Sequence, residues 1–121
     1  MHANRDVTPG RTTVTPEVLL DIVRLEVQKV PGVHSLAPVP GMFNRILRRS
    51  RTGVRLSMEG EVVDAEVYVI LNHNVNLRQT AREVQSAVAQ ALERLVGLRV
   101  GRVNVYIEDI HYPPSSTEEE G

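Results

Sequence analysis

Five arginines dominate one short segment of the chain. Arg45, Arg48, Arg49 and Arg51 fall close together and Arg55 follows, so residues 41–55 contain five basic and no acidic side chains. A guanidinium group can donate two parallel hydrogen bonds to a phosphate or a carboxylate. Three interpretations follow: the arginines bind phosphate on nucleic acid or lipid headgroups, they dock an acidic protein partner, or they form a solvated loop that pairs with nearby acids.

Carboxylates and histidines offer a second kind of chemistry. Asp64 and Glu66 are two residues apart on a predicted strand, which puts both side chains on one face, where paired carboxylates can bind a cation or exchange protons. His73 and His111 complete the candidate set for an enzyme or metal site. No two histidines have the i, i+4 spacing of metal ligands, and solvated carboxylates ordinarily cover a polar sheet face. We therefore expect no catalytic residue, no metal and no cofactor.

Composition argues against several other kinds of site. The chain has no cysteine, so it has no disulfide framework and no thiolate chemistry. None of its eight glycines builds a phosphate-binding loop, and no two have the Gly-x-x-Gly spacing with which KH-type modules clamp a nucleic-acid backbone. One phenylalanine and three tyrosines are too few for an aromatic platform that stacks single-stranded bases.

Two amphipathic helices are predicted to position these residues. The first begins at Thr15-Pro16-Glu17, where threonine can cap free amides and proline suits the first turn, and it ends at Pro31-Gly32. The second begins at Asn76, with Gln79 in the capping-box position, and stops at Gly97. Apolar residues recur at spacings of three and four through both segments, so each helix has one face to bury.

Strands are predicted wherever apolar and polar residues alternate. A short extended piece covers 33–39, Gly53 to Glu59 and Val63 to Asn72 follow, and the last strand lies in 102–110. Glu59-Gly60-Glu61 is predicted to form a hairpin turn. One face of these strands is apolar. The other is polar and carries four apolar or aromatic side chains that we take as exposed contact points, namely Tyr68, Ile70, Tyr106 and Ile110.

The order of elements, α-β-β-β-α-β, predicts an α+β two-layer sandwich. A mostly antiparallel sheet of about four strands would carry both helices on its apolar face. We expect a flexible N-terminal arm over 1–14, a single domain over 15–112 that includes a basic loop at 41–52, and a disordered acidic tail over 113–121. The N-terminus lacks an apolar core, and the run Val67 to Leu71 is too short to cross a bilayer, so we expect a cytoplasmic protein.

The sequence resembles the bacterial alkaline-shock-type envelope stress response proteins over about residues 12–111. The matching segments are the first helix with its turn (13–18 and 27–33), two central strands (53–56 and 67–71), the long helix (77–88) and the closing strand (97–107). The arginine cluster departs from the family, many members of which have a short glycine-rich stretch there. The resemblance implies a non-enzymatic bacterial cytoplasmic protein. Some relatives work at the membrane through a separate anchoring protein, and some are connected with the control of lipid synthesis.

The leading hypothesis is therefore a small interaction or scaffold protein of the envelope stress response. It would bind a protein partner, for example a membrane-anchoring protein or a second copy of itself. The alternative is a module that binds nucleic acid or an anionic surface through the arginine-rich segment. The candidate partner-binding residues are Arg45, Arg48, Arg49, Arg51, Arg55, Tyr68, Ile70, Tyr106 and Ile110.

Overall fold

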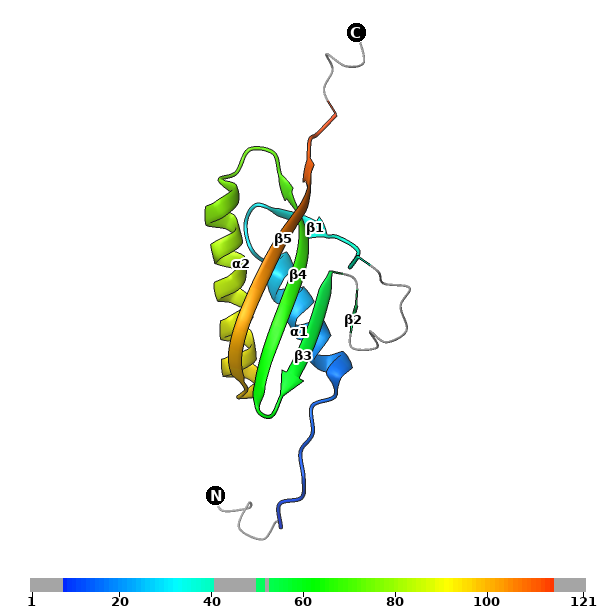
Figure 1. The fold of residues 1–121 in the computed structure, drawn as a ribbon, viewed down its shortest axis with the longest axis vertical. Helices are drawn as coiled ribbons and strands as arrows, with labels where there is room; N and C mark the ends of the chain where they lie inside the picture. Colours follow the sequence, from blue (N-terminus) through cyan, green and yellow to red (C-terminus); the bar gives the residue numbers. More distant parts are fainter. Residues whose placement is uncertain (1–7, 41–49, 52, 115–121) are drawn as a thin grey trace.

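The computed structural model describes residues 8–40, 50–51 and 53–114 and confirms the α+β two-layer sandwich. Both long helices lie on one face of a single sheet (Figure 1). The predicted order is confirmed, and one short strand at residues 50–51 is added to it. The elements are α1 (Pro16–Gln28), β1 (Val33–Leu36), β2 (Ser50–Arg51), β3 (Val54–Glu59), β4 (Val62–Asn72), α2 (Leu77–Ala91), the π-helical turn η2 (Leu92–Val96) and β5 (Arg99–His111).

The strand β4 is the centre of the sheet. It pairs antiparallel with β3 along its first half and with β1 near its end, while β2 adds to the outer side of β3. β5 runs along the other side of β4 and is parallel to it. This parallel pairing is possible because α2 carries the chain back to the start of β4. The hairpin predicted around Gly60 is confirmed, with Gly60 at φ +63° between β3 and β4.

The two helices begin in different ways. Asn76 Oδ1 accepts a hydrogen bond of 2.9 Å from the backbone N–H of Gln79, which confirms the predicted cap of α2. Thr15 occupies the N-cap position of α1, but its side chain makes no capping bond, so the predicted side-chain cap is wrong. Only its carbonyl takes part, accepting from the N–H groups of Val18 and Leu19. Gly97 ends the second helical segment at φ +80°, as predicted.

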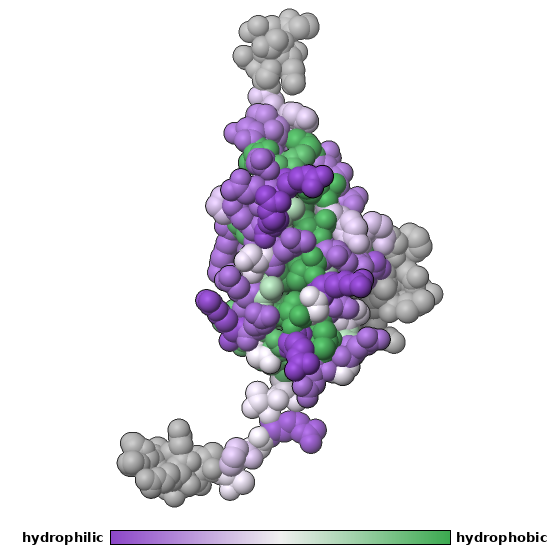
Figure 2. All heavy atoms as spheres, turned by 60° about the vertical axis from the view of Figure 1, so that its left-hand side comes forward, coloured by the Kyte–Doolittle hydropathy of each residue, from purple (hydrophilic) through white to green (hydrophobic). Residues whose placement is uncertain are grey.

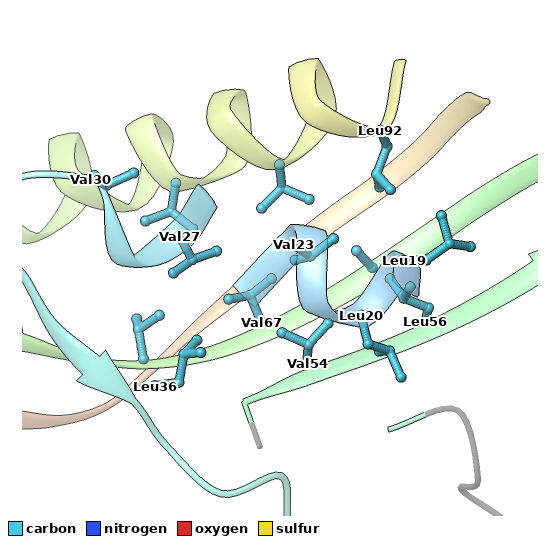
Figure 3. Packing of buried hydrophobic residues seen from close by; sticks show 14 of the residues in the cluster. Leu19, Leu20, Val23, Val27, Val30, Leu36, Val54, Leu56, Val67 and Leu92 are labelled. Atoms are coloured by element: carbon cyan, nitrogen blue, oxygen red, sulfur yellow. The ribbon is translucent and has the colours of Figure 1, made fainter. Parts of the chain in front are cut away.

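The main core lies between the helices and the apolar face of the sheet. Leu20, Val23 and Val27 of α1 pack over Val54 and Val67, and each of these side chains is at most 1% exposed (Figure 3). The predicted apolar side of β4 is confirmed, because all five of its members are fully buried: Val63, Ala65, Val67, Val69 and Leu71.

Two irregularities in the pairing of β5 with β4 change which side chains share a face. The register shifts between Val63 and Ala65 and again between Val69 and Ile70. After the second shift Ile110 lies opposite Leu71 and packs against the main core. The prediction that Ile110 belongs to the polar face is therefore wrong, because one extra residue in β5 reverses the alternation beyond Ile107.

The predicted division of the chain reaches beyond the described residues. Residues 8–14 are exposed and form neither helix nor strand. Residues 1–7, 41–49, 52 and 115–121 lie outside the described part, so the flexible arm, the basic loop and the disordered tail stay predictions. Among the described residues, no helix is both long enough and apolar enough to cross a bilayer.

Candidate functional site

The candidate site is the face of the sheet opposite the helices, which we call the open face. A row of four side chains crosses it from β3 to β5: Arg55, then Glu66 and Tyr68, then Tyr106. Arg55 lies directly opposite Glu66 in the antiparallel β3–β4 pair, and Tyr68 lies beside Tyr106 in the parallel β4–β5 pair. The row therefore follows from the register of three strands, since opposite residues in a sheet place their side chains on the same face.

Glu66 is the hub of this row. Its Oε1 atom accepts hydrogen bonds from Arg55 Nε at 2.9 Å, from Arg55 Nη2 at 2.5 Å and from the Tyr68 hydroxyl at 2.9 Å. The Arg55 and Glu66 side chains are each 31% exposed. The pair is thus fixed by geometry yet partly open to solvent, which gives the open face an ordered polar patch.

Tyr68 is buried beneath its neighbours. It is 6% exposed and packs in a second, smaller apolar cluster with Ala37 and Val39, against which Ile70 also packs. Its ring stacks on that of Tyr106 with centroids 4.9 Å apart. The expectation that Tyr68 is an exposed contact is therefore wrong, whereas Tyr106 is 40% exposed on the same face. Tyr106 is the aromatic member of the row that a partner can reach.

The row shifts the pKa values of two of its members. The hydrogen bond to Glu66 raises the pKa of the Arg55 guanidinium, so Arg55 keeps its charge. Burial raises the pKa of the Tyr68 phenol, and the hydrogen bond to Glu66 adds to the shift. Both effects favour a charged arginine and a neutral tyrosine at neutral pH.

Asp64 has a different, structural partner. Its Oδ1 atom accepts a hydrogen bond of 2.7 Å from the backbone N–H of Arg102, at the first irregularity of β5. The space for this carboxylate exists because Gly101 has no side chain. A Cβ at Gly101 would collide with Asp64 Oδ1 and come within 3.0 Å of Val62 Cγ1. Asp64 and Glu66 share a face as predicted, but they hold separate groups rather than one ligand.

The histidines gather at the far end of the sheet. The ring of His111 stacks on that of His34 at a centroid distance of 3.7 Å, and His73 contacts Tyr112. His111 is level with Asn72, eight residue steps along β4 from Asp64, which is a distance of about 26 Å at roughly 3.3 Å per residue. The structure thus does not bring the histidines together with the carboxylates, and the described residues contain no group of three or more potential metal ligands.

A hollow of about 500 Å³ lies at the opposite end, beside the β3–β4 turn. Its walls are formed by Glu61, Glu93, Gly97, Leu98 and Arg99. None of the carboxylates and histidines singled out in the sequence lines it.

The arginine cluster is divided by the structure. Arg45, Arg48 and Arg49 lie outside the described residues. Arg51 belongs to β2, whose backbone pairs with that of β3. Arg55 is already engaged by Glu66. Of the three interpretations of the cluster, pairing with a nearby acid therefore describes Arg55.

The cover over Tyr68 was not expected from the sequence. Ala37 and Val39, 3% and 2% exposed, follow β1 and lie on the open face rather than on the helix face. The backbone N–H of Ala37 donates to the Tyr68 carbonyl at 2.8 Å, which holds this segment beside β4. In the sequence, this cover was indicated only by the apolar residue that stands beside each of Pro38 and Pro40. That pattern is too short to show a helical or strand periodicity.

Comparison with known proteins gives consistent results. Residues 4–112 match the alkaline shock protein 23 family, which has a cell envelope-related function. The uncharacterized protein YloU of Bacillus subtilis is 24% identical over 106 residues, covering 84% of this chain and 88% of that protein. The uncharacterized protein Spy1535 of Streptococcus pyogenes is 26% identical over 103 residues, covering 84% and 79%.

Solved structures share the fold. The copper form of MamM CTD superimposes with a TM-score of 0.51 and 17% identity, covering 82% of this chain and 90% of that one. At this level of identity the likeness concerns the arrangement of helices and strands alone.

Proposed function

Because the chain belongs to the alkaline shock protein 23 family, whose function is cell envelope-related, we propose that it acts as a non-enzymatic interaction protein near the bacterial membrane. It works from the cytoplasmic side and binds a protein partner, such as a membrane-anchoring protein, through the open face of its sheet. This role fits a domain in which Asp64, Glu66 and His111, three of the candidates for an enzyme or metal site, are engaged in structural contacts at separate places.

The ordered row on the open face carries this proposal. The helices leave that face uncovered (Figure 1), and a half-exposed Tyr106 lies beside the fixed Arg55–Glu66 pair. Tyrosine and arginine are enriched at the energetic centres of protein interfaces, because each offers a large contact area with a polar end. Because the Arg55–Glu66 pair is already ordered before binding, less conformational entropy is lost when a partner binds.

Site-specific crosslinking in the native cell tests the proposal. A photoreactive phenylalanine analogue replaces Tyr106 in one strain and the exposed Ser86 of α2 in a control strain. We expect Tyr106 to give a discrete crosslinked product that sediments with the membrane fraction. A second variant, Tyr106→Ala, should lower the membrane-bound share of the protein, whereas Ser86→Ala should leave it unchanged. Identical products from both positions, or membrane binding unaffected by Tyr106→Ala, would contradict the proposal.

Binding of an anionic surface through the arginine-rich segment is the alternative function, and it now rests on Arg45, Arg48, Arg49 and Arg51. It predicts salt-sensitive binding to anionic vesicles or to RNA that is lost when these four are replaced by alanine. The same replacement leaves the open face intact. A comparison of the wild-type strain with the strain that carries the four alanines therefore distinguishes the two functions. No binding to either probe at low salt would exclude the alternative.

A further inference from the structure

The strand β5 forms one edge of the sheet over its whole length. It has 13 residues and pairs with β4 on one side, and within the described residues no strand pairs with its other side. A long edge presents unpaired backbone N–H and C=O groups, which form a template for a strand of another chain. Such an edge leads to association of sheets unless a feature of the structure blocks it.

The apolar side chains of β5 add to this tendency. Their counterparts on β4 are at most 1% exposed, whereas on β5 they are only half-buried. Figure 2 turns the side of α2 and β5 toward the viewer and shows a band of hydrophobic side chains between hydrophilic flanks. A strand added to β5 would remove more of this apolar surface from water, which favours association. The half-buried residues of β5 are Val100, Val103, Val105, Ile107 and Ile110.

Two irregularities limit the part of β5 that another strand could use. The pairing with β4 shifts its register between Val63 and Ala65 and again between Val69 and Ile70. Irregularities of this kind bend a strand and disrupt its ladder of hydrogen bonds. Between them β5 is regular over the five residues from Val103 to Ile107, and ordinary strands have about 5–6 residues. The irregularities therefore shorten the available edge without removing it.

Gln85 of α2 occupies the first residue of this regular stretch. Its Nε2 atom donates a hydrogen bond of 3.0 Å to the Val103 carbonyl. The next residue before it, Val84, is fully buried in the core, while Gln85 itself is exposed, so α2 holds the amide at the border of the helix layer. Because β4 runs along the other side of β5, this bond lies at the free edge. A strand laid along β5 would have to displace the Gln85 amide.

The bond leaves little of the edge for another strand. Beyond Val103, the regular stretch continues only from Asn104 to Ile107. Successive residues of a strand direct their backbone groups to opposite sides, so only every second residue of this remainder can bond outward. A strand that pairs with so short a stretch gains few backbone hydrogen bonds to offset the entropy lost on association.

We propose that Gln85 protects the edge of β5 from strand addition, by keeping the Val103 carbonyl occupied in the folded protein. The half-buried apolar side chains of β5 then stay at the surface without joining the sheets of two chains. This role goes beyond the proposed function, since it concerns the edge of β5 and not the partner-binding open face.

Replacement of one glutamine tests the proposal. Gln85→Ala removes the amide, and α2 should stay folded because alanine has the higher helix propensity. The concentration at which half of the protein sediments as larger assemblies should fall by about fivefold, the factor in an equilibrium constant that a typical hydrogen bond gives. Gln90→Ala is the matched control, because Gln90 Nε2 bonds to Ser86 Oγ within the same helix, and it should sediment as the wild type does.

A charge on the edge tests where the variant associates. Lysine on an edge strand opposes strand addition, and Asn104 is exposed within the regular stretch. Gln85→Ala combined with Asn104→Lys should therefore sediment as the wild type does. Gln85→Ala combined with Gln28→Lys, which adds the same charge at an exposed position of α1, should still associate. Asn104→Lys alone should match the wild type, because Gln85 already blocks the edge.

Lower stability is a separate cause of association and has its own control. Asn76→Ala removes the side-chain cap of α2 and leaves the bond between Gln85 and Val103 in place. Urea denaturation followed by circular dichroism gives the stability of each variant. We expect Gln85→Ala to associate at a stability close to that of the wild type, and Asn76→Ala to sediment as the wild type does.

Three results would overturn the proposal. In the first, Gln85→Ala associates no more than the wild type, or to the same degree as Gln90→Ala or Asn76→Ala. In the second, its association persists after Asn104→Lys is added, which shows that another surface joins the chains. In the third, Asn104→Lys alone lowers the association of the wild type, which shows that the edge is open while Gln85 is present.

Discussion

The absence of a side chain at Gly101 determines the backbone contacts near the start of β5. This position leaves room for Asp64, which in turn holds the Arg102 N–H. This contact fixes the first irregularity of the strand, so that Val103 and Val105 face the core as they do.

Gly101→Ala should therefore destabilise the protein. The new Cβ overlaps Asp64 Oδ1 and Val62 Cγ1, and forced overpacking of this kind costs about 1–3 kcal/mol in the free energy of unfolding. Urea denaturation followed by circular dichroism measures the change. Gly10→Ala is the matched control, because nothing lies within 4 Å of its added Cβ. Equal stability of the two variants would show that the Asp64 contact is dispensable.

Tyr68 links stability to alkaline pH. Burial and the bond to Glu66 raise its pKa in the folded state above the ordinary value of 10.0. The folded protein thus keeps this proton when the unfolded chain has lost it. The resulting stabilisation is complete below pH 10 and disappears as pH rises through the folded-state pKa.

Tyr68→Phe removes that linkage. We expect the free energy of unfolding of the wild type to fall more steeply above about pH 10 than that of the variant. Denaturation curves at several pH values on both sides of pH 10 give the two slopes. Parallel slopes for the two proteins would mean that the Tyr68 proton is not held by the fold.

At the scale of the element, the two helix starts make a matched pair. Asn76 caps α2 with a side-chain hydrogen bond, whereas Thr15 in the same position of α1 contributes only its carbonyl. Their residue types are both typical caps, so only the structure separates them.

Asn76→Ala should cost about 1 kcal/mol in the free energy of unfolding, because an amide of the first turn loses its acceptor. Thr15→Ala should cost much less, since no side-chain bond is lost. The comparison needs only thermal or chemical denaturation of both variants. A larger loss for Thr15→Ala would contradict the capping geometry described here.

Local sequence patterns were sufficient to predict the helices and strands, but not the irregularities in strand pairing. The alternation in β3 and β4 and the helical stripes depend on neighbours in sequence, and the strands and helices that they predict were confirmed. The position of Ile110 depends on an extra residue in a strand paired with a distant partner, which leaves no mark on composition. The order and direction of strands around β4 likewise follow from tertiary packing.

The site was less predictable than the fold for the same reason. Arg55 and Tyr106 were recognised as candidates, but the bond from Arg55 to Glu66 depends on a cross-strand register of the β3–β4 hairpin. The burial of Tyr68 depends on Ala37 and Val39, a segment about thirty residues away in sequence. Exposure at single positions is set by such contacts, not by the residue's own type.

At the scale of the whole molecule, one core joins both helices to the sheet. Residues of α1, β1, β3, β4, α2 and η2 belong to the same buried cluster, and the half-buried apolar residues of β5 pack against it. The second cluster is small and rests on Tyr68 of the central strand. Neither helix therefore has a separate core on which it could remain folded.

We expect a single cooperative unfolding transition. Helix content, followed by far-ultraviolet circular dichroism, and the environment of the three tyrosines, followed by fluorescence, should change at the same denaturant concentration. Helix signal lost ahead of the tyrosine signal would show that the helices leave the sheet before the sheet opens.

The central place of β4 has a consequence for the order of synthesis. Its antiparallel partners β1 and β3 precede it in the chain, but its parallel partner β5 ends at His111 and leaves the ribosome after all the other described strands. Until then, the most apolar strand of the protein has one open edge while the chain is still being made. A nascent chain stalled before β5 should thus be the species that chaperones bind and that aggregates, although the finished protein hides that edge completely.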